Sequence, residues 1–303
     1  MPTSTTTRAA HRLFLGEPAA PGADRSSGDY GRLLGARAPA DAYSSPAGLQ
    51  RRPWLGRLRR GLAEDLFVLH YQPIVSLSDG RVSHYEALIR LADEPGDGLV
   101  APGRFLPAAE RYGLIRDIDR MVIGKVTALL GDCSAVAELQ DPEVTVAVNV
   151  SALSVTDETM LRHLERQLTV HGVEPSRLVI EVTETAAISD MERARTFCAG
   201  VEALGCAVAL DDFGAGFGSF QYLKHLPFSY LKIDGDFIRG MPGSRTDQLV
   251  VKALVGVVRG MGRRTIAEFV GDQPTLEMLR SYGVDYAQGF QVGRPRPLLA
   301  RAA

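Results

Sequence analysis

The sequence predicts an α/β fold, a (β/α)₈ barrel whose first strand pairs antiparallel with the second. Short β-rich apolar runs alternate with helical segments from residue 67 onward, which is the pattern of successive βα units. A doubly wound sheet also alternates in this way, but it usually has a Gly-rich loop after its first strand, and this chain has none there. The turn Ser78-Asp79-Gly80 after the first run is instead typical of a hairpin.

Eight runs between residues 66 and 297 are read as strands, and this length is close to the roughly 250 residues typical of such a barrel. They are Phe67–Pro73, Val82–Ile89, Val144–Val148, Leu178–Val182, Ala207–Leu210, Tyr230–Ile233, Thr265–Ala267 and Val284–Gln288.

Residues 1–52 differ from the rest of the chain, because they are rich in Ala, Pro, Gly, Ser and Arg and have no sustained apolar period. We expect a disordered or weakly structured tail over 1–52 and a folded domain over 53–303. Trp54, Leu58 and Leu62 are spaced for one face of a helix, so a short amphipathic helix should open the domain.

The composition excludes several classes of protein. In 303 residues, 34 Lys and Arg against 36 Asp and Glu give a formal net charge of −2, which gives no signal for binding duplex nucleic acid or a membrane surface. No apolar run approaches the roughly 18 residues that span a bilayer, and a secretory signal is absent. Cys133, Cys198 and Cys206 lack CxxC spacing, which argues against disulfides and thiolate zinc sites and favours a reducing cytoplasm.

Polar residues lie within or directly after the apolar runs. Burying such groups is costly unless they are compensated, and the carboxyl ends of barrel strands meet at one rim, where active sites are built. Each residue alone has a simpler explanation, such as a helix N-cap or a turn. Their recurrence on successive strands predicts a shared site. They are Glu86, Asn149, Glu181, Asp211, Asp212, Lys232, Asp234, Glu268 and Gln288.

Converging acids repel one another, so this rim is expected to bind a cation. Oxygen ligands select hard ions such as Mg²⁺ or Mn²⁺ over Zn²⁺. An aspartate pair suits two ions about 4 Å apart that activate water for phosphoryl-ester hydrolysis, with Asp211 as the bridge and Asp212 on the second ion. Lys232, at a solvent-accessible rim, would hold a water or a phosphate oxygen, and Arg90 would bind phosphate.

Several motifs recur in order along the chain. They are Tyr71-Gln72-Pro73-Ile74-Val75, Glu86-Ala87-Leu88-Ile89-Arg90, Asn149-Val150-Ser151, Glu181-Val182-Thr183-Glu184, Asp211-Asp212-Phe213-Gly214-Ala215-Gly216, Lys232-Ile233-Asp234, Ala267-Glu268 and Gln288-Gly289-Phe290. In these motifs, over roughly residues 55 to 298, the sequence resembles the EAL domain family of bacterial cyclic di-GMP phosphodiesterases. The resemblance implies a cytoplasmic second-messenger enzyme that linearises cyclic di-GMP to pGpG with Mg²⁺ or Mn²⁺, commonly as a homodimer.

The resemblance also implies a role for each matching residue. The ligands of the first metal would be Glu86, Asn149, Glu181 and Asp211, and Asp212 would bind the second metal. Lys232 resembles the lysine that positions the attacking water, and Glu268 resembles the general base. Glu184 resembles the glutamate that steadies the loop containing Asp212-Phe213-Gly214. The expected contacts to the dinucleotide are Gln72, Leu88, Arg90, Asp234 and Gln288.

One motif departs from the family. Ala267-Glu268-Phe269-Val270-Gly271 stands where the family usually has Ala-Glu-Gly-Val-Glu, so an outer carboxylate is replaced by Gly271. Losses of this kind at metal sites commonly cost about 10–100-fold, and weakened activity is expected. A catalytically weak or inactive receptor for cyclic di-GMP, or a protein-interaction module, is therefore the alternative function. The presence of all the metal ligands and the lysine favours the enzyme.

Overall fold

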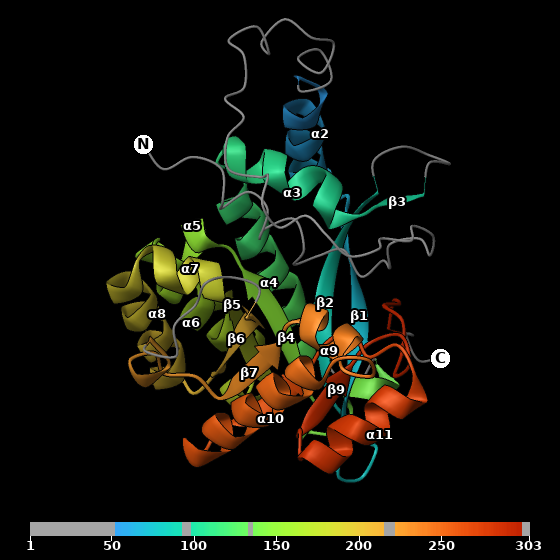
Figure 1. Cartoon of the computed structure of the whole chain (residues 1–303). Coiled ribbons are helices and arrows are strands. Elements are labelled where there is room, and N and C mark those ends of the chain that lie inside the picture. The colour runs from blue at the N-terminus through green and yellow to red at the C-terminus, as the bar shows by residue number, and fades with distance from the viewer. Residues whose placement is uncertain (1–51, 93–97, 133–135, 215–221, 299–303) are drawn as a thin grey trace, which may run out of the picture.

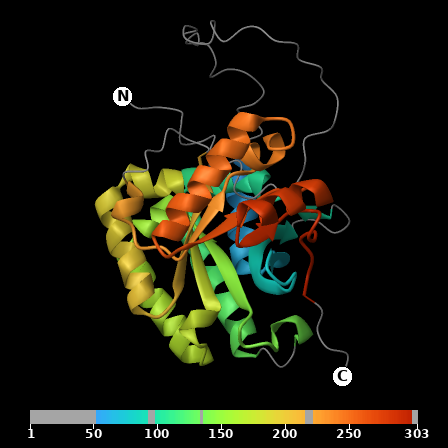
Figure 2. The ribbon, with the colours of Figure 1, turned by 60° about the horizontal axis from the view of Figure 1, so that its bottom comes forward.

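The computed structural model describes residues 52–92, 98–132, 136–214 and 222–298. Its strands form one sheet that closes into a barrel (Figures 1 and 2). The strands are β1 (Phe67–Ser76), β2 (Val82–Ala92), β3 (Leu99–Val100), β4 (Thr145–Val150), β5 (Leu178–Thr183), β6 (Ala207–Phe213), β7 (Tyr230–Ile233), β8 (Arg264–Ala267) and β9 (Tyr286–Gln288).

The barrel has the order β1-β9-β8-β7-β6-β5-β4-β2 and is closed by pairing of β1 with β2. β1 runs antiparallel to both of its neighbours, whereas the other neighbouring strands of the ring pair in parallel. This confirms the predicted (β/α)₈ barrel with an antiparallel first strand. The hairpin is confirmed too, since the Ser76 amide donates to the Arg81 carbonyl and Gly80 takes the positive φ of 76° that the turn needs.

Helices surround the strands on the outside of the barrel (Figures 1 and 2). α2 and α3 lie beside the upper parts of β1 and β2 in Figure 1. The helices are α2 (Arg52–Ala63), α3 (Pro102–Arg111), α4 (Ile115–Gly131), α5 (Ala152–Val155), α6 (Thr159–His171), α7 (Glu184–Ser189), α8 (Met191–Ala203), α9 (Gly235–Gly240), α10 (Arg245–Gly260) and α11 (Gln273–Tyr282).

The predicted strands match the observed ones, with differences at their ends. β7 has the predicted bounds, whereas β1, β2 and β6 continue three residues further than the apolar runs. The sequence analysis missed β3, because a two-residue strand carries no periodic pattern. The predicted opening helix is confirmed as α2, and apart from Arg52 the predicted tail lies outside the described residues.

The main apolar core lies between the strands and the surrounding helices. Every residue of β4 is buried, as expected for a parallel strand covered on both faces. A second, smaller apolar group, formed by Ala147, Val179 and Ala209, is separate from this main core. These three residues belong to the neighbouring strands β4, β5 and β6, so they form a layer of small side chains in the barrel interior.

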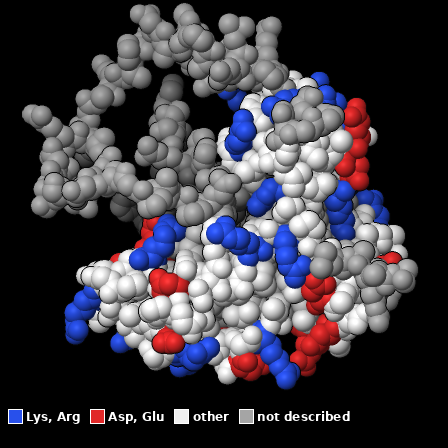
Figure 3. Space-filling view, turned by 90° about the vertical axis from the view of Figure 1, so that its right-hand side faces the viewer, with Lys and Arg blue, Asp and Glu red and all other residues white. Residues whose placement is uncertain are grey.

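Surface charge is mixed over the face shown in Figure 3, where basic and acidic side chains both lie among uncharged ones. None of the helices in the described ranges is long and apolar enough to cross a membrane.

We predict that deleting residues 1–51 leaves the melting temperature within a few degrees of that of the full chain. The described core already includes Leu58 of α2, whose side chain is completely buried, so the shortened chain keeps the helix that closes this part of the core. Thermal unfolding of both proteins measures the effect. A large drop in melting temperature would mean that the tail packs on the barrel.

Candidate active site

Eight polar side chains, seven in barrel strands and one directly after β8, lie in a single layer near the carboxyl ends of the parallel strands. Side chains two residues apart on a strand point to the same face. Asn149, Glu181 and Asp211 therefore point into the barrel, each two residues beyond a member of the interior apolar layer. The eight residues, which we call the polar layer, are Gln72, Glu86, Asn149, Glu181, Asp211, Lys232, Glu268 and Gln288, and all are buried.

Lys232 is the centre of the polar layer. Its Nζ lies 2.9 Å from Glu181 Oε2, 3.0 Å from Asp211 Oδ1, 3.0 Å from Glu268 Oε1 and 3.6 Å from Glu86 Oε2. Burial lowers the pKa of Lys232, but the surrounding carboxylates outweigh it and hold that pKa well above its usual value. The ammonium group is therefore charged at neutral pH.

The expectation of a solvent-accessible Lys232 is wrong. Its side chain is only 1% exposed. The β7 strand ends one residue later, at Ile233, and the lysine is surrounded by the acids of β2, β5 and β6 and by Glu268, directly after β8. A buried charge of this kind is held by its ion partners and not by water.

Two adjacent aspartates enter the site because β6 is irregular at its end. Neighbouring residues of a regular strand point to opposite faces, but the register between β6 and β7 shifts between Leu210 and Phe213. Asp212 adopts a left-handed φ of 55°, and its amide donates to Asp211 Oδ1 at 2.9 Å. Burial, together with the charges of Asp211 and Asp234, raises the pKa of Asp212 to about 8.

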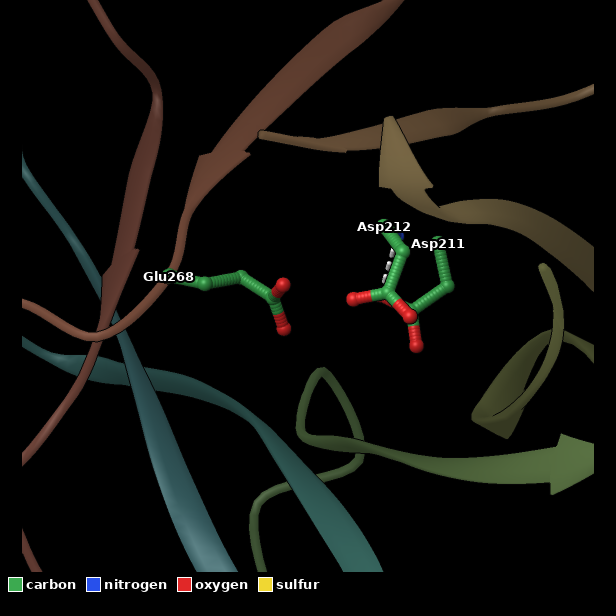
Figure 4. Close-up of side chains that lie close together, drawn as sticks. All are labelled: Asp211, Asp212 and Glu268. Atoms are coloured by element: carbon green, nitrogen blue, oxygen red, sulfur yellow. Dashed lines mark hydrogen bonds between the residues drawn. The ribbon is translucent and has the colours of Figure 1, made fainter. Parts of the chain in front are cut away.

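Glu268 faces this aspartate pair from the far side of the barrel mouth, as Figure 4 shows. Carboxylate oxygens of Asp211, Asp212 and Glu268 lie within 4.8 Å of one another. Burial raises the pKa of Glu268 well above its usual value; the Lys232 charge opposes this, and Asp211 and Asp212 add to it. The sequence analysis gave Glu268 only the role of a base, whereas its position also makes it a candidate metal ligand.

The donor set fits a hard divalent cation. Glu181 Oε1 and Glu268 Oε2 are buried and accept no hydrogen bond from the described residues. Burial also raises the pKa of Glu181 and of Asp211, an effect that the Lys232 charge only partly offsets. Unpaired buried carboxylate oxygens are costly, and a divalent ion compensates them.

A chain of hydrogen bonds orders the other half of the polar layer. Asn149 Nδ2 donates to Glu86 Oε1 at 2.7 Å, and Gln288 Nε2 donates to Glu86 Oε2 at 2.5 Å. Gln288 Nε2 also lies 3.2 Å from Gln72 Oε1, and Gln72 Nε2 donates to the Gly293 carbonyl at 3.0 Å. Asn149 and Gln288 therefore fix the carboxylate plane of Glu86, and Gln72 in turn orders Gln288.

The remaining predicted residues lie around the polar layer. Leu88 and Arg90 lie on the same face of β2 as Glu86, at intervals of two residues. Both come after Ala87, which forms the last pair between β2 and β4, with Val148. Asp234 is buried and caps α9 by accepting from the Asp236 amide at 2.7 Å. Its observed contact is thus structural, as a capping residue's is.

Glu184 is placed to hold the loop that follows β6. Its Oε2 accepts a hydrogen bond from the Gly214 amide at 2.8 Å, two residues after Asp212. The contact joins Glu184 to the start of this loop, and the loop-stabilising role stays a prediction. Ala215 and Gly216 of that motif lie outside the described residues.

The loop after β8 carries the departure from the family motif. Phe269 has a left-handed φ of 53°, which a bulky residue rarely adopts, and its ring lies against Gly235 and beneath the Arg239 guanidinium. Gly271 is exposed, and a Cβ atom there would meet only the Phe269 carbonyl oxygen, at 4.0 Å. A larger residue thus fits at position 271.

Sequence reasoning missed Asp119 of α4, which is buried and accepts hydrogen bonds from the segment directly after β4. The pattern held a signal for it: Asp119 lies four residues after Ile115 and three before Val122, so it falls on the apolar face of its helix.

Comparison with known proteins decides the family, because the EAL domain family matches residues 55–295. The chain belongs to the EAL domain family. This EAL domain is 35% identical over 246 residues to the cyclic di-GMP phosphodiesterase PdeB of Shewanella oneidensis, a match that covers 81% of this chain and 28% of PdeB. It is 36% identical over 252 residues to the bifunctional diguanylate cyclase/cyclic di-GMP phosphodiesterase MucR of Pseudomonas aeruginosa, covering 81% of this chain and 36% of MucR. The chain thus spans about a third of the length of these relatives.

Solved EAL structures have the same fold. The MucR phosphodiesterase in complex with c-di-GMP superposes with a TM-score of 0.75 at 36% identity, covering 81% of this chain and 98% of that structure. The FimX EAL domain of Xanthomonas citri in complex with c-diGMP also gives 0.75, at 30% identity, covering 84% and 98%.

We predict that Lys232→Met destabilises the metal-free EAL domain by about 3–5 kcal/mol, because the substitution leaves the surrounding carboxylates without their cation. Thermal unfolding in EDTA measures the loss. The control is Lys125→Met. The Lys125 ammonium pairs with the largely exposed Asp65, so this substitution should cost less than about 1 kcal/mol. Equal losses for the two variants would contradict the central role of Lys232.

Proposed function

We propose that this chain hydrolyses cyclic di-GMP to linear pGpG with a divalent metal, Mg²⁺ or Mn²⁺. The observation that carries the proposal is the polar layer, in which carboxylate oxygens of four buried acids lie within 3.6 Å of the buried Lys232 Nζ. The names of PdeB and MucR support the same activity, since each includes a cyclic di-GMP phosphodiesterase.

Metal ions would be held by the acids and the amide of the polar layer together with Asp212. Glu86, Asn149, Glu181 and Asp211 would hold the first ion, and Asp212 would hold the second with Asp211. The unpartnered oxygen of Glu268 is available to the same site. When bound, such ions lower the pKa of a coordinated water and stabilise the leaving oxygen of a phosphodiester.

The chain's own groups complete the reaction. Lys232 positions the attacking water through its ammonium N–H groups, and Glu268 accepts the proton of that water. Glu268 is placed for this role because its carboxylate lies across the barrel mouth from Asp211 and Asp212, within 4.8 Å of their oxygens. The water oxygen forms a bond to phosphorus, one ester P–O bond breaks, and the ribose oxygen leaves and takes up a proton. One ester bond is opened, so the ring becomes linear.

The substrate contacts lie beyond the polar layer. Arg90 binds a phosphate through its planar guanidinium, and Leu88, one step nearer to Glu86 on the same face of β2, packs against the dinucleotide. Gln72, Gln288 and Asp234 supply polar contacts. Gln72 and Gln288 are already ordered by their own hydrogen bonds, which reduces the entropy lost on binding.

A homodimer in a reducing cytoplasm is part of the proposal. Leu153 of α5 and Ile188 of α7 are 38% and 46% exposed, and these two helices pack against each other near the loop after β6. Apolar side chains exposed together are typical of an interface. The buried, unpaired thiols of Cys198 and Cys206 suit a reducing compartment. Light scattering of the purified chain tests the dimer.

The direct test is incubation of the full chain with cyclic di-GMP and Mg²⁺ or Mn²⁺, followed by chromatography of the nucleotides. Conversion to pGpG supports the enzyme. Intact cyclic di-GMP after long incubation, together with measurable binding, would establish the receptor instead, and absence of both would leave a protein-interaction module.

We predict that Asp211→Ala abolishes hydrolysis, because it removes the ligand shared by both ions. Glu86→Ala should do the same through the first ion. The control is Asp79→Ala in the exposed hairpin turn, which should keep full activity. Initial rates of pGpG formation measure the effect, and substantial activity in Asp211→Ala would rule out the two-metal assignment.

Glu268→Gln separates the enzyme from the receptor. We predict preserved cyclic di-GMP binding and a rate lower by about 10²–10⁴-fold, as is typical when acid–base catalysis is lost. Calorimetric binding and single-turnover rates are the two readouts. A variant as fast as the natural chain would remove Glu268 from the chemistry.

Gly271→Glu restores the carboxylate that the family motif usually carries. We predict a modest gain in rate, within about tenfold, because there is room for the side chain at position 271. Steady-state rates in Mn²⁺ measure it, with Gly271→Gln as the uncharged control. An unchanged rate in Gly271→Glu would mean that Phe269 has already reorganised this loop.

A further inference from the structure

Asp119 is a buried carboxylate on α4 that faces the end of β4. Asp119 is only 5% exposed, and its Oδ2 atom accepts three hydrogen bonds. The donors are the Ser151 amide at 3.0 Å, the Ser151 hydroxyl at 2.6 Å and the Ser154 hydroxyl at 2.7 Å. All three belong to the junction between β4 and α5.

No Lys, Arg or His of the described ranges forms an ion pair with Asp119, although the next residue, Arg120, pairs with Asp117 and Asp157. A buried carboxylate without an ion-pair partner is costly, and here it is compensated mainly by N–H and O–H donors. These hydrogen bonds also fix the positions of Ser151 and Ser154, because all three are accepted by one oxygen atom of Asp119, on a helix that packs against the barrel.

The end of β4, which leads into the junction that Asp119 holds, pairs with a neighbouring strand on one side only. Pairing of β2 with β4 ends at Ala87 and Val148, whereas β4 and β5 continue to pair through Asn149 with Glu181 and Val150 with Val182. Asn149 thus lies where β4 has lost its β2 neighbour. Ser151, two residues later, is tied to α4 and caps α5, since its hydroxyl accepts from the Ser154 amide at 3.3 Å.

We propose that Asp119 is a positioning residue for the metal site: by fixing Ser151 it holds the free side of β4 and so keeps the Asn149 amide against Glu86. This inference rests on the proposed function, in which Asn149 and Glu86 bind the first ion. The Asn149 Nδ2 to Glu86 Oε1 distance of 2.7 Å is the contact that it maintains. Asp119 itself does not touch the metal or the substrate.

The chain offers a matched control at the opposite end of the barrel. Asp285 accepts hydrogen bonds from the Thr265 amide at 2.8 Å and the Thr265 hydroxyl at 3.0 Å, at the amino end of β8. The type of contact is the same as between Asp119 and Ser151, but it lies away from the polar layer. Removing it should destabilise the fold without altering metal binding.

The test is calorimetric Mn²⁺ binding to the full chain, combined with thermal unfolding in EDTA. We expect Asp119→Ala to weaken Mn²⁺ binding by about tenfold or more, as losses in the outer shell of a metal site commonly do. Asp119→Asn keeps an acceptor oxygen and should bind within about threefold of the natural chain. Asp285→Ala should lower the melting temperature and leave Mn²⁺ affinity unchanged.

Three results would overturn the inference: natural affinity in a folded Asp119→Ala, equal weakening in Asp285→Ala, or a loss in Asp119→Asn as large as in Asp119→Ala. If Asp119→Ala does not fold, Ser151→Ala replaces it, because it removes one of the three donors and should weaken binding in the same direction but less. If the natural chain binds no Mn²⁺, the proposed metal site itself is refuted. This outcome is distinct from the three above, which refute only the role of Asp119.

Discussion

The buried ammonium group of Lys232 is the interaction on which the rest of the site depends. It meets carboxylates from three strands and from Glu268, directly after a fourth, and without it these buried acids would repel one another. One positive charge does not balance four negative ones. The excess explains why burial leaves the pKa values of Glu181 and Glu268 high, and why the site has the character of a cation-binding centre.

The barrel makes this concentration of charge possible. Each strand carries one side chain of the polar layer, in the strand itself or, for β8, directly after it. Small apolar side chains below this layer, such as Ala147, Val179 and Ala209, fill the interior. The main core outside the strands supplies the stability that the polar layer does not. The candidate functional side chains therefore lie in one layer, and the residues around that layer form an ordinary packed core.

Local departures from regular geometry lie next to the reacting groups. Asp212 and Phe269 are non-glycine residues with left-handed φ, and they follow Asp211 and Glu268 directly. Each costs of order 1–3 kcal/mol, which the surrounding contacts must offset. At Asp212 the strain turns a second carboxylate toward the site. At Phe269 it sets the ring against Gly235, which has no side chain in the way.

The strand pattern determined the eight strands, the antiparallel first strand and every member of the polar layer except Gln72, because a period of two and polar residues at the ends of apolar runs are local properties. Gln72 followed only from the resemblance to the family. Sequence missed what depends on distant partners: the burial of Lys232 is decided by acids in or directly after four other strands, and the role of Asp119 by a serine 32 residues away. The orientation of Asp212 needed the register shift between β6 and β7. Only the tertiary structure decided these points, since charge compensation, burial and register belong to groups that the chain brings together through folding.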